Sequence, residues 1–107
     1  MNEISIDQSE NGETVPARVG DTIQVRLPEN PSTGYLWKLA SEVEPALRLI
    51  SSDYTSPQTS APGARGTRVY LFKAVQPGEA VIELEHKRPW EAGAGANRFA
   101  VHIEVQS

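Results

Sequence analysis

Nucleophilic or metal chemistry in this chain would have to rest on two histidines, because the sequence contains no cysteine. Neither His86 nor His102 lies in a catalytic motif, and the sequence around them indicates that both imidazoles are surface groups. Glu83 and Glu85 alternate along one segment, which is typical of a solvated strand face rather than of a paired acid and base. No glycine-rich loop leads from a predicted strand into a helix, as phosphate binding requires. The sequence therefore predicts a binding protein that is not an enzyme and that needs no metal or cofactor.

A stiff polar loop is predicted where the sequence reads NPSTGY. Pro31 fixes its own φ near −65° and favours an extended Asn30, whereas Gly34 can adopt the positive φ needed to re-enter a strand. Ser32 and Thr33 are left at the tip, where small polar side chains could enter a narrow cleft. A tip that is ordered before docking loses little extra entropy on binding. The residues of this loop are Asn30, Pro31, Ser32, Thr33, Gly34 and Tyr35.

Two further irregular segments carry residues suited to recognition. One contains Arg88, Pro89 and Trp90, a cation and a large aromatic side chain separated by a rigid proline. Trp and Arg are the side chains that most often dominate protein interfaces. Trp90 either is exposed for binding or folds back as a lid on the end of the domain. The other segment contains the run Gly63, Ala64, Arg65 and Gly66.

Together, the three motifs resemble those of the chagasin family of cysteine-protease inhibitors. That family carries an Asn-Pro-Thr/Ser-Thr-Gly-aromatic loop, a Gly-x-Gly-Gly loop and an Arg-Pro-Trp loop, in this order, on an immunoglobulin-like β-sandwich. Here NPSTGY, GARG and RPW follow one another in the same order at suitable spacing. The resemblance implies tight, reversible, non-covalent inhibition of papain-like cysteine proteases. It also implies a complex of one inhibitor with one protease, with the three loops filling the active-site cleft.

The resemblance further implies a role for each loop. Thr33 would lie closest to the protease's Cys–His pair, on a wedge whose shape is held by Asn30, Pro31 and Gly34. Trp90 and its neighbours would flank the wedge on the leaving-group side of the cleft. The middle loop would lie on the other side, along the subsites that hold the residues before the scissile bond, and would pair mainly through backbone groups.

The middle loop departs from the family pattern at one position. Where the family has glycine, this chain has Arg65, and a non-glycine residue costs about 1 kcal/mol if that position requires a positive φ. Arg65 is either simply solvated, or it lies beside the cleft and favours proteases with acidic subsites.

About seven β-strands are predicted to position these loops. Alternating apolar residues indicate strands over residues 4–6, 23–27, 35–39, 47–51, 69–74, 80–86 and 99–105. Pro77 and Gly78 suit the two central positions of a turn, so we expect a hairpin between the fifth and sixth of these strands. Short strands without crossover helices predict an all-β fold, an immunoglobulin-like antiparallel β-sandwich with the three loops at one end. Trp37 is expected in its core.

Length and charge limit the remaining possibilities. The chain has 107 residues and a formal charge of −4, which predicts a single soluble domain over residues 1–107. Without a basic stripe or a long apolar run, we expect neither nucleic acid nor membrane as a partner. The N-terminus has no leader pattern, so the protein is expected in the cytosol or exported with a leader removed. As an inhibitor of this kind, it is expected to act as a monomer.

A second function class remains open from the sequence. The chain could be an immunoglobulin-like module that binds a carbohydrate or another protein through a platform of Trp37, Tyr54 and Trp90. A sugar platform should place its aromatic side chains on a sheet face, whereas inhibition needs Thr33 and Trp90 in loops at the same end.

Overall fold

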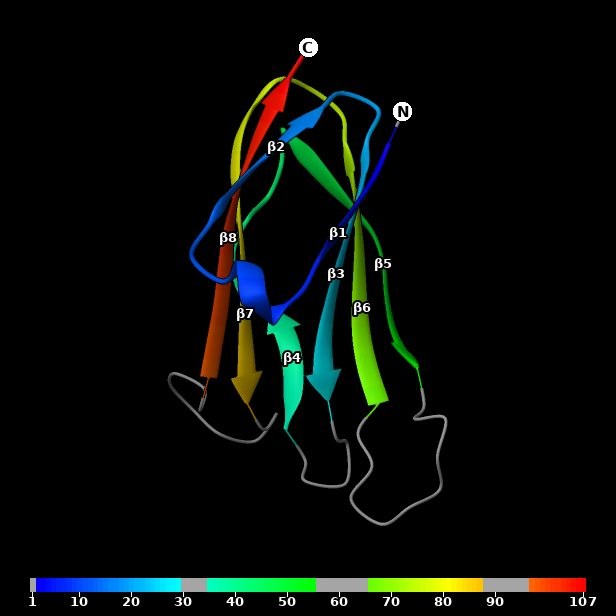
Figure 1. Cartoon of the computed structure of the whole chain (residues 1–107), viewed down its shortest axis with the longest axis vertical. Helices are drawn as coiled ribbons and strands as arrows, with labels where there is room; N and C mark the ends of the chain where they lie inside the picture. Colours follow the sequence, from blue (N-terminus) through cyan, green and yellow to red (C-terminus); the bar gives the residue numbers. More distant parts are fainter. Residues whose placement is uncertain (1, 30–34, 56–65, 88–96) are drawn as a thin grey trace.

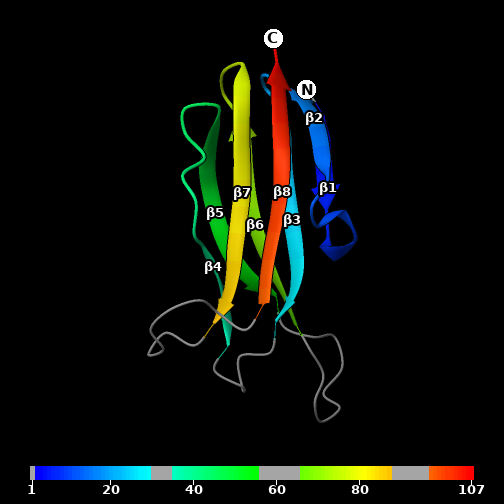
Figure 2. The ribbon, with the colours of Figure 1, turned by 90° about the vertical axis from the view of Figure 1, so that its left-hand side faces the viewer.

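The computed structural model describes residues 2–29, 35–55, 66–87 and 97–107, and these form two β-sheets packed face to face (Figures 1 and 2). One short 3₁₀ turn, η1 (Gln8–Glu10), lies between the first two strands. The strands are β1 (Glu3–Ile6), β2 (Thr14–Arg18), β3 (Thr22–Glu29), β4 (Leu36–Leu39), β5 (Leu47–Thr55), β6 (Gly66–Ala74), β7 (Gly78–Lys87) and β8 (Asn97–Gln106). The predicted all-β sandwich is confirmed.

Both sheets are mixed rather than purely antiparallel, which corrects the sequence-based expectation. One sheet has the order β1-β3-β6-β5 and the other β2-β8-β7-β4. The β1–β3 and β2–β8 pairs are parallel, and all other pairs are antiparallel. Two parallel strands that are neighbours in a sheet must be joined by a crossover connection. Between β1 and β3 the chain passes through β2 in the opposite sheet, and this passage is the crossover. The eighth strand, missing from the expected seven, is β2, whose Pro16 is tolerated because β2 is an edge strand.

The core lies between the sheets and follows the predicted alternation. Ile23, Val25 and Leu27 face inward from β3 and are almost completely buried. Trp37 is 5% exposed, which confirms it as a core residue. On β5 the register shifts between Leu49 and Ser51, and Leu49 is exposed although it belongs to the apolar alternation. Other buried apolar side chains are those of Ile6, Leu47, Phe72, Ile82, Leu84, Phe99, Val101 and Ile103.

The connection from β6 to β7 is not the hairpin that the turn residues predict. Gly78 does adopt a positive φ of 146°, as a turn glycine can. However, β6 pairs with β3 and β5, whereas β7 pairs with β4 and β8 in the other sheet. The turn therefore carries the chain between sheets, because turn chemistry specifies a change of direction and not a pairing partner.

A buried carboxylate organises the end of the sandwich where β3 begins, which we call the far end. Asp21 is 4% exposed and accepts hydrogen bonds from the backbone N–H groups of Asn2 (3.0 Å) and Arg18 (2.9 Å). These hydrogen bonds favour the charged form and lower the pKa of Asp21 below its ordinary value. Both marked chain ends lie at the far end (Figure 1). Residues 2–29, 35–55, 66–87 and 97–107 include no helix that could span a lipid bilayer.

Candidate functional site

Six strand ends meet at the end of the sandwich opposite the chain termini, which we call the loop end (Figure 1). Strand pairing places them there, because Glu29 lies opposite Gly66 and Leu36 lies opposite Lys87. These ends border the three ranges 30–34, 56–65 and 88–96. The six residues are Glu29, Leu36, Thr55, Gly66, Lys87 and Asn97. The fold therefore brings the starts and finishes of all three predicted recognition segments to one end of the molecule.

Most of the predicted site residues lie outside the described part of the chain, so their roles stay predictions. Those outside it are Asn30, Pro31, Ser32, Thr33, Gly34, Gly63, Ala64, Arg65, Arg88, Pro89 and Trp90. Tyr35 and Gly66 are described, and both lie at the loop end.

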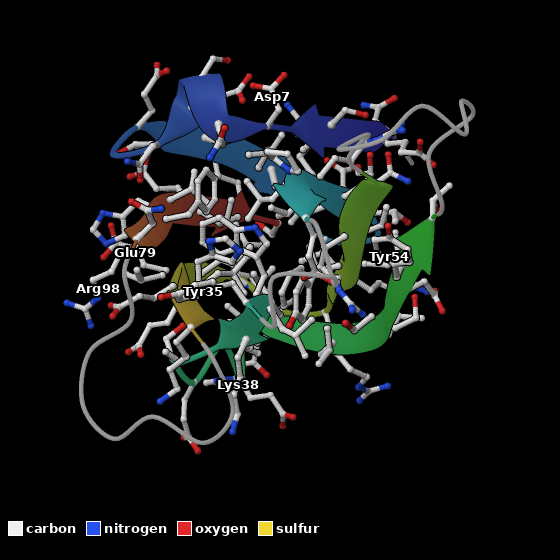
Figure 3. All side chains as sticks on the ribbon, turned by 90° about the horizontal axis from the view of Figure 1, so that it is seen from below. Asp7, Tyr35, Lys38, Tyr54, Glu79 and Arg98 are labelled. Carbon is white, nitrogen blue, oxygen red and sulfur yellow. The ribbon has the colours of Figure 1, made fainter. Side chains whose placement is uncertain are left out.

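Tyr35, His86 and Trp37 form a stack of rings at the loop end. The His86 ring lies 4.7 Å from that of Trp37, with an interplanar angle of 17°, and the Tyr35 ring lies 5.4 Å away on a tilted approach. Figure 3 shows Tyr35 at this end, on the side of the β7 sheet. The expectation that His86 is a surface imidazole is therefore wrong, because antiparallel pairing sets it opposite Trp37 and leaves it half-buried. His102 is exposed, as predicted.

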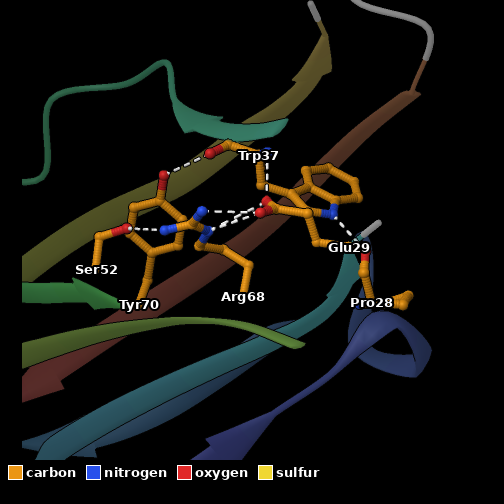
Figure 4. Close-up of polar contacts among 6 residues, drawn as sticks. All are labelled: Pro28, Glu29, Trp37, Ser52, Arg68 and Tyr70. Carbon is orange, nitrogen blue, oxygen red and sulfur yellow. Dashed lines mark hydrogen bonds and ion pairs between the residues drawn. The ribbon is translucent and has the colours of Figure 1, made fainter. Parts of the chain in front are cut away.

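A fully buried carboxylate lies directly beside the first predicted loop. The side chain of Glu29 has no exposed surface, and it accepts hydrogen bonds from Nε of Arg68 (3.1 and 3.2 Å) and Nη2 of Arg68 (2.8 Å) (Figure 4). Its Oε2 also accepts the backbone N–H of Trp37 at 2.9 Å. The hydrogen bonds from Arg68 to Glu29 raise the pKa of the guanidinium above its ordinary value. A buried charge requires such compensation, since an unpaired one costs several kcal/mol.

Trp37 joins the two sheets through three hydrogen bonds. Besides its backbone N–H, its indole Nε1–H donates to the carbonyl of Pro28 at 2.9 Å. Its own carbonyl accepts the hydroxyl of Tyr70 at 2.7 Å (Figure 4). Trp37 belongs to β4 in one sheet, whereas all three of its partners belong to β3 and β6 in the other. The loop end is therefore held by directional polar contacts as well as by apolar packing.

Sequence reasoning missed Glu29, although the sequence does contain a signal for it. Glu29 is in phase with the inward residues Ile23, Val25 and Leu27, so alternation alone directs its carboxylate into the core. Arg68 is likewise in phase with the inward Tyr70 on β6. An acidic residue and a basic residue that both fall on inward positions indicate a buried ion pair.

Gly66 is a buried strand residue, packed too closely for any side chain. A Cβ at this position would overlap the Tyr54 ring and the backbone carbonyl of Thr55. We expect Gly66→Ala to lower the free energy of unfolding by about 1–3 kcal/mol, because the Thr55 carbonyl belongs to a sheet ladder and cannot move aside freely. Denaturant titration would measure this, and an unchanged midpoint would show that the strands separate more easily than the contacts imply.

The aromatic platform required by a carbohydrate-binding module is not formed by Trp37 and Tyr54. Trp37 is 5% exposed and lies under His86. Tyr54 is half-buried on β5, with the guanidinium of Arg68 over its ring at 5.9 Å (labelled in Figure 3). These two side chains therefore serve packing, which disfavours that alternative.

Positive side chains surround a shallow cavity of about 360 Å³ at the loop end. Its lining includes Lys38, Arg68 and Lys87, together with Leu36 and Trp37. Among the described residues no group of three or more His, Asp and Glu side chains is arranged to hold a metal ion. The described side chains that line this cavity offer hydrogen-bond donors and positive charge.

Comparison with known proteins finds one family across most of the chain. Residues 16–105 match the family model described as chagasin family peptidase inhibitor I42. Chagasin of Trypanosoma cruzi is 25% identical over 105 residues, covering 94% of this chain and 96% of chagasin. Amoebiasin-1 of Entamoeba histolytica is 31% identical over 106 residues, covering 96% of this chain and all of that protein. The crystal structure of the cysteine protease inhibitor EhICP2 from Entamoeba histolytica superposes with a TM-score of 0.89, at 22% identity over 99% of this chain and 97% of that one.

Proposed function

The chain belongs to the chagasin family of peptidase inhibitors, and on that premise we propose that it is a tight, reversible, non-covalent inhibitor of papain-like cysteine proteases. The observation that carries the proposal is the convergence of six strand ends at the loop end. Those strand ends border the ranges 30–34, 56–65 and 88–96, which hold RPW and all of NPSTGY and GARG except Tyr35 and Gly66. One end of a rigid sandwich can thereby present all three motifs to a single cleft.

The first loop acts as the wedge in this proposal. Thr33 lies nearest the protease's Cys–His pair, and Asn30, Pro31 and Gly34 hold the shape of the loop. A folded loop presents its carbonyls away from the near-attack geometry that acylation requires. The protease is therefore blocked without cutting the inhibitor.

The other two loops flank the wedge. Arg88, Pro89 and Trp90 lie on the leaving-group side, where stacking of Trp90 on an aromatic surface adds about 0.5–1.5 kcal/mol beyond its buried area. Gly63, Ala64 and Arg65 lie along the opposite subsites, with Gly66 as the strand residue that anchors them. Because all three loops border one end of the molecule, we expect one inhibitor to fill the cleft of one protease. We further propose that the inhibitor acts as a monomer.

Titration of papain with the purified protein tests this function. We expect activity to fall linearly and to reach its minimum at one equivalent, whereas trypsin, a serine protease, keeps its activity. The inhibitor recovered from the complex should be intact by mass spectrometry. Cleavage within residues 30–35, or full papain activity at large excess of the protein and across a small panel of related proteases, would contradict the proposal.

Replacement of Trp90 tests the contribution of the third loop. We expect Trp90→Ala to raise the inhibition constant roughly 30-fold, because a tryptophan that dominates an interface contributes about 2 kcal/mol or more. The near-ultraviolet spectrum and unfolding midpoint of the variant would show whether it is folded. If Trp90 is a lid on the sandwich instead, the midpoint falls and the inhibition constant of the folded variant stays unchanged.

A further inference from the structure

We propose that Glu29 is a positioning residue for inhibition, whose buried carboxylate fixes the strand ends that carry the first and middle loops relative to one another. The inference rests on the proposed function and goes beyond the loop residues to which inhibition is assigned.

The first step concerns the two ends of the first loop segment. Glu29 immediately precedes residues 30–34, and its Oε2 accepts the backbone N–H of Trp37 at 2.9 Å, just beyond the other end of that segment. Pro28 accepts the indole N–H of the same tryptophan. The entry and the exit of the segment are therefore held together by hydrogen bonds that do not involve the segment itself.

The second step concerns the middle segment. Arg68 follows Gly66 by two residues, so its guanidinium is fixed close to the point where the middle segment re-enters β6. Nε and Nη2 of Arg68 both donate to Glu29. Two N–H groups of one planar guanidinium that bind one carboxylate fix the orientation of the two side chains as well as their distance. One carboxylate thereby links β3, β4 and β6 at the loop end.

The free energy of the buried ion pair favours a positioning role over a purely stabilising one. A buried ion pair gains little stability over well-packed apolar side chains, because removing both charges from water offsets their attraction. The neighbouring inward residues on β3 are apolar and are equally well buried, so the sandwich could be closed without a charge at this position. Unlike apolar packing, the ion pair of Glu29 and Arg68 is directional, so it fixes the end of β3 relative to the start of β6.

Asp21 provides a matched comparison within the same molecule. It is also a buried carboxylate at a strand end, and it also accepts backbone N–H groups, but it lies at the far end. A loss of inhibition caused only by general destabilisation should follow replacement of either acid. If Glu29 positions the strand ends, only the replacement of Glu29, and not that of Asp21, should weaken inhibition.

The experiment compares Glu29→Gln, Arg68→Lys and Asp21→Asn with the unaltered protein. Inhibition constants for papain are measured at a temperature where all four proteins are folded, and amide and indole hydrogen exchange of Trp37 is measured in the free proteins. We expect Glu29→Gln to weaken inhibition on the order of tenfold and to accelerate exchange at Trp37, because a neutral amide oxygen is a weaker acceptor than a carboxylate oxygen for both the Arg68 guanidinium and the Trp37 N–H. Arg68→Lys should have a smaller effect in the same direction, because it keeps the charge and loses the fork. Asp21→Asn should leave both readouts within about twofold while still lowering the unfolding midpoint.

Each outcome decides the inference. Unchanged inhibition by folded Glu29→Gln would overturn it, as would an equal loss of inhibition in Asp21→Asn. If Glu29→Gln does not fold, Arg68→Lys carries the same comparison. If the unaltered protein does not inhibit papain or related proteases, the proposed function fails separately, and exchange at Trp37 then decides whether Glu29 holds the strand ends.

Discussion

Replacing Thr33 with glutamate is expected to weaken inhibition of papain by at least about 100-fold, the factor that corresponds to roughly 2.7 kcal/mol. In the proposed complex, Thr33 lies closest to the protease's Cys–His pair, where its side chain would lose its contact with water. A carboxylate at that position must be desolvated without a partner designed for it, and burying an unpaired charge is among the most costly changes in an interface. Glutamate is also larger than threonine, so we expect it to fit less well in a narrow cleft. The measurement is the inhibition constant of the folded variant.

Thr14→Glu is the matched control for this substitution. Thr14 is exposed on the edge strand β2 and pairs with His102 in the middle part of β8, away from the loop end. The same change of residue type and charge there should leave inhibition unchanged. If Thr33→Glu still inhibits within about threefold of the unaltered protein, Thr33 is not at the centre of the contact.

Arg68→Met is expected to lower the free energy of unfolding by about 3–5 kcal/mol, the largest stability effect we predict. The substitution keeps an unbranched side chain of similar length, but it leaves the carboxylate of Glu29 buried without its counter-charge. It also removes the guanidinium from the ring of Tyr54. Chemical denaturation followed by tryptophan fluorescence would measure the loss.

The double variant Glu29→Gln with Arg68→Met separates the ion pair from the packing of the arginine stem. A glutamine oxygen can still accept the backbone N–H of Trp37, and no buried charge remains. We expect the double variant to recover most of the stability that Arg68→Met loses, so the two substitutions should be strongly non-additive. Additive losses would show that the charge of Glu29 is stabilised by other groups.

Much of the fold follows from local pattern. Period-two alternation predicted the strands that form the sandwich and placed residues such as Ile23, Val25 and Trp37 in its core, because burial on one face of a strand selects every second residue. The strand it missed, β2, is short and contains Pro16. Alternation also contained the information for Glu29, since the rule that directs an apolar residue inward acts equally on an acidic one.

The three segments predicted to bind a protease are marked in the sequence by proline, glycine and small polar residues, which interrupt the alternation of the strands. What these residues do in a complex depends on a partner and stays a prediction. The strand ends that carry them are described, and their common location follows from pairing such as Glu29 with Gly66 and Leu36 with Lys87.

The sequence by itself determined seven of the eight strands, the buried face of most of them, and the family that the three motifs resemble. Only the tertiary structure decided which strands are neighbours: β6 and β7 are joined by a turn yet lie in different sheets, and β1 runs parallel to β3. It also decided that Glu29 meets Arg68, 39 residues away, and that His86 stacks on Trp37. The physical reason is that alternation is a local property of one strand, whereas pairing is chosen by the best combined burial and hydrogen bonding of the whole chain.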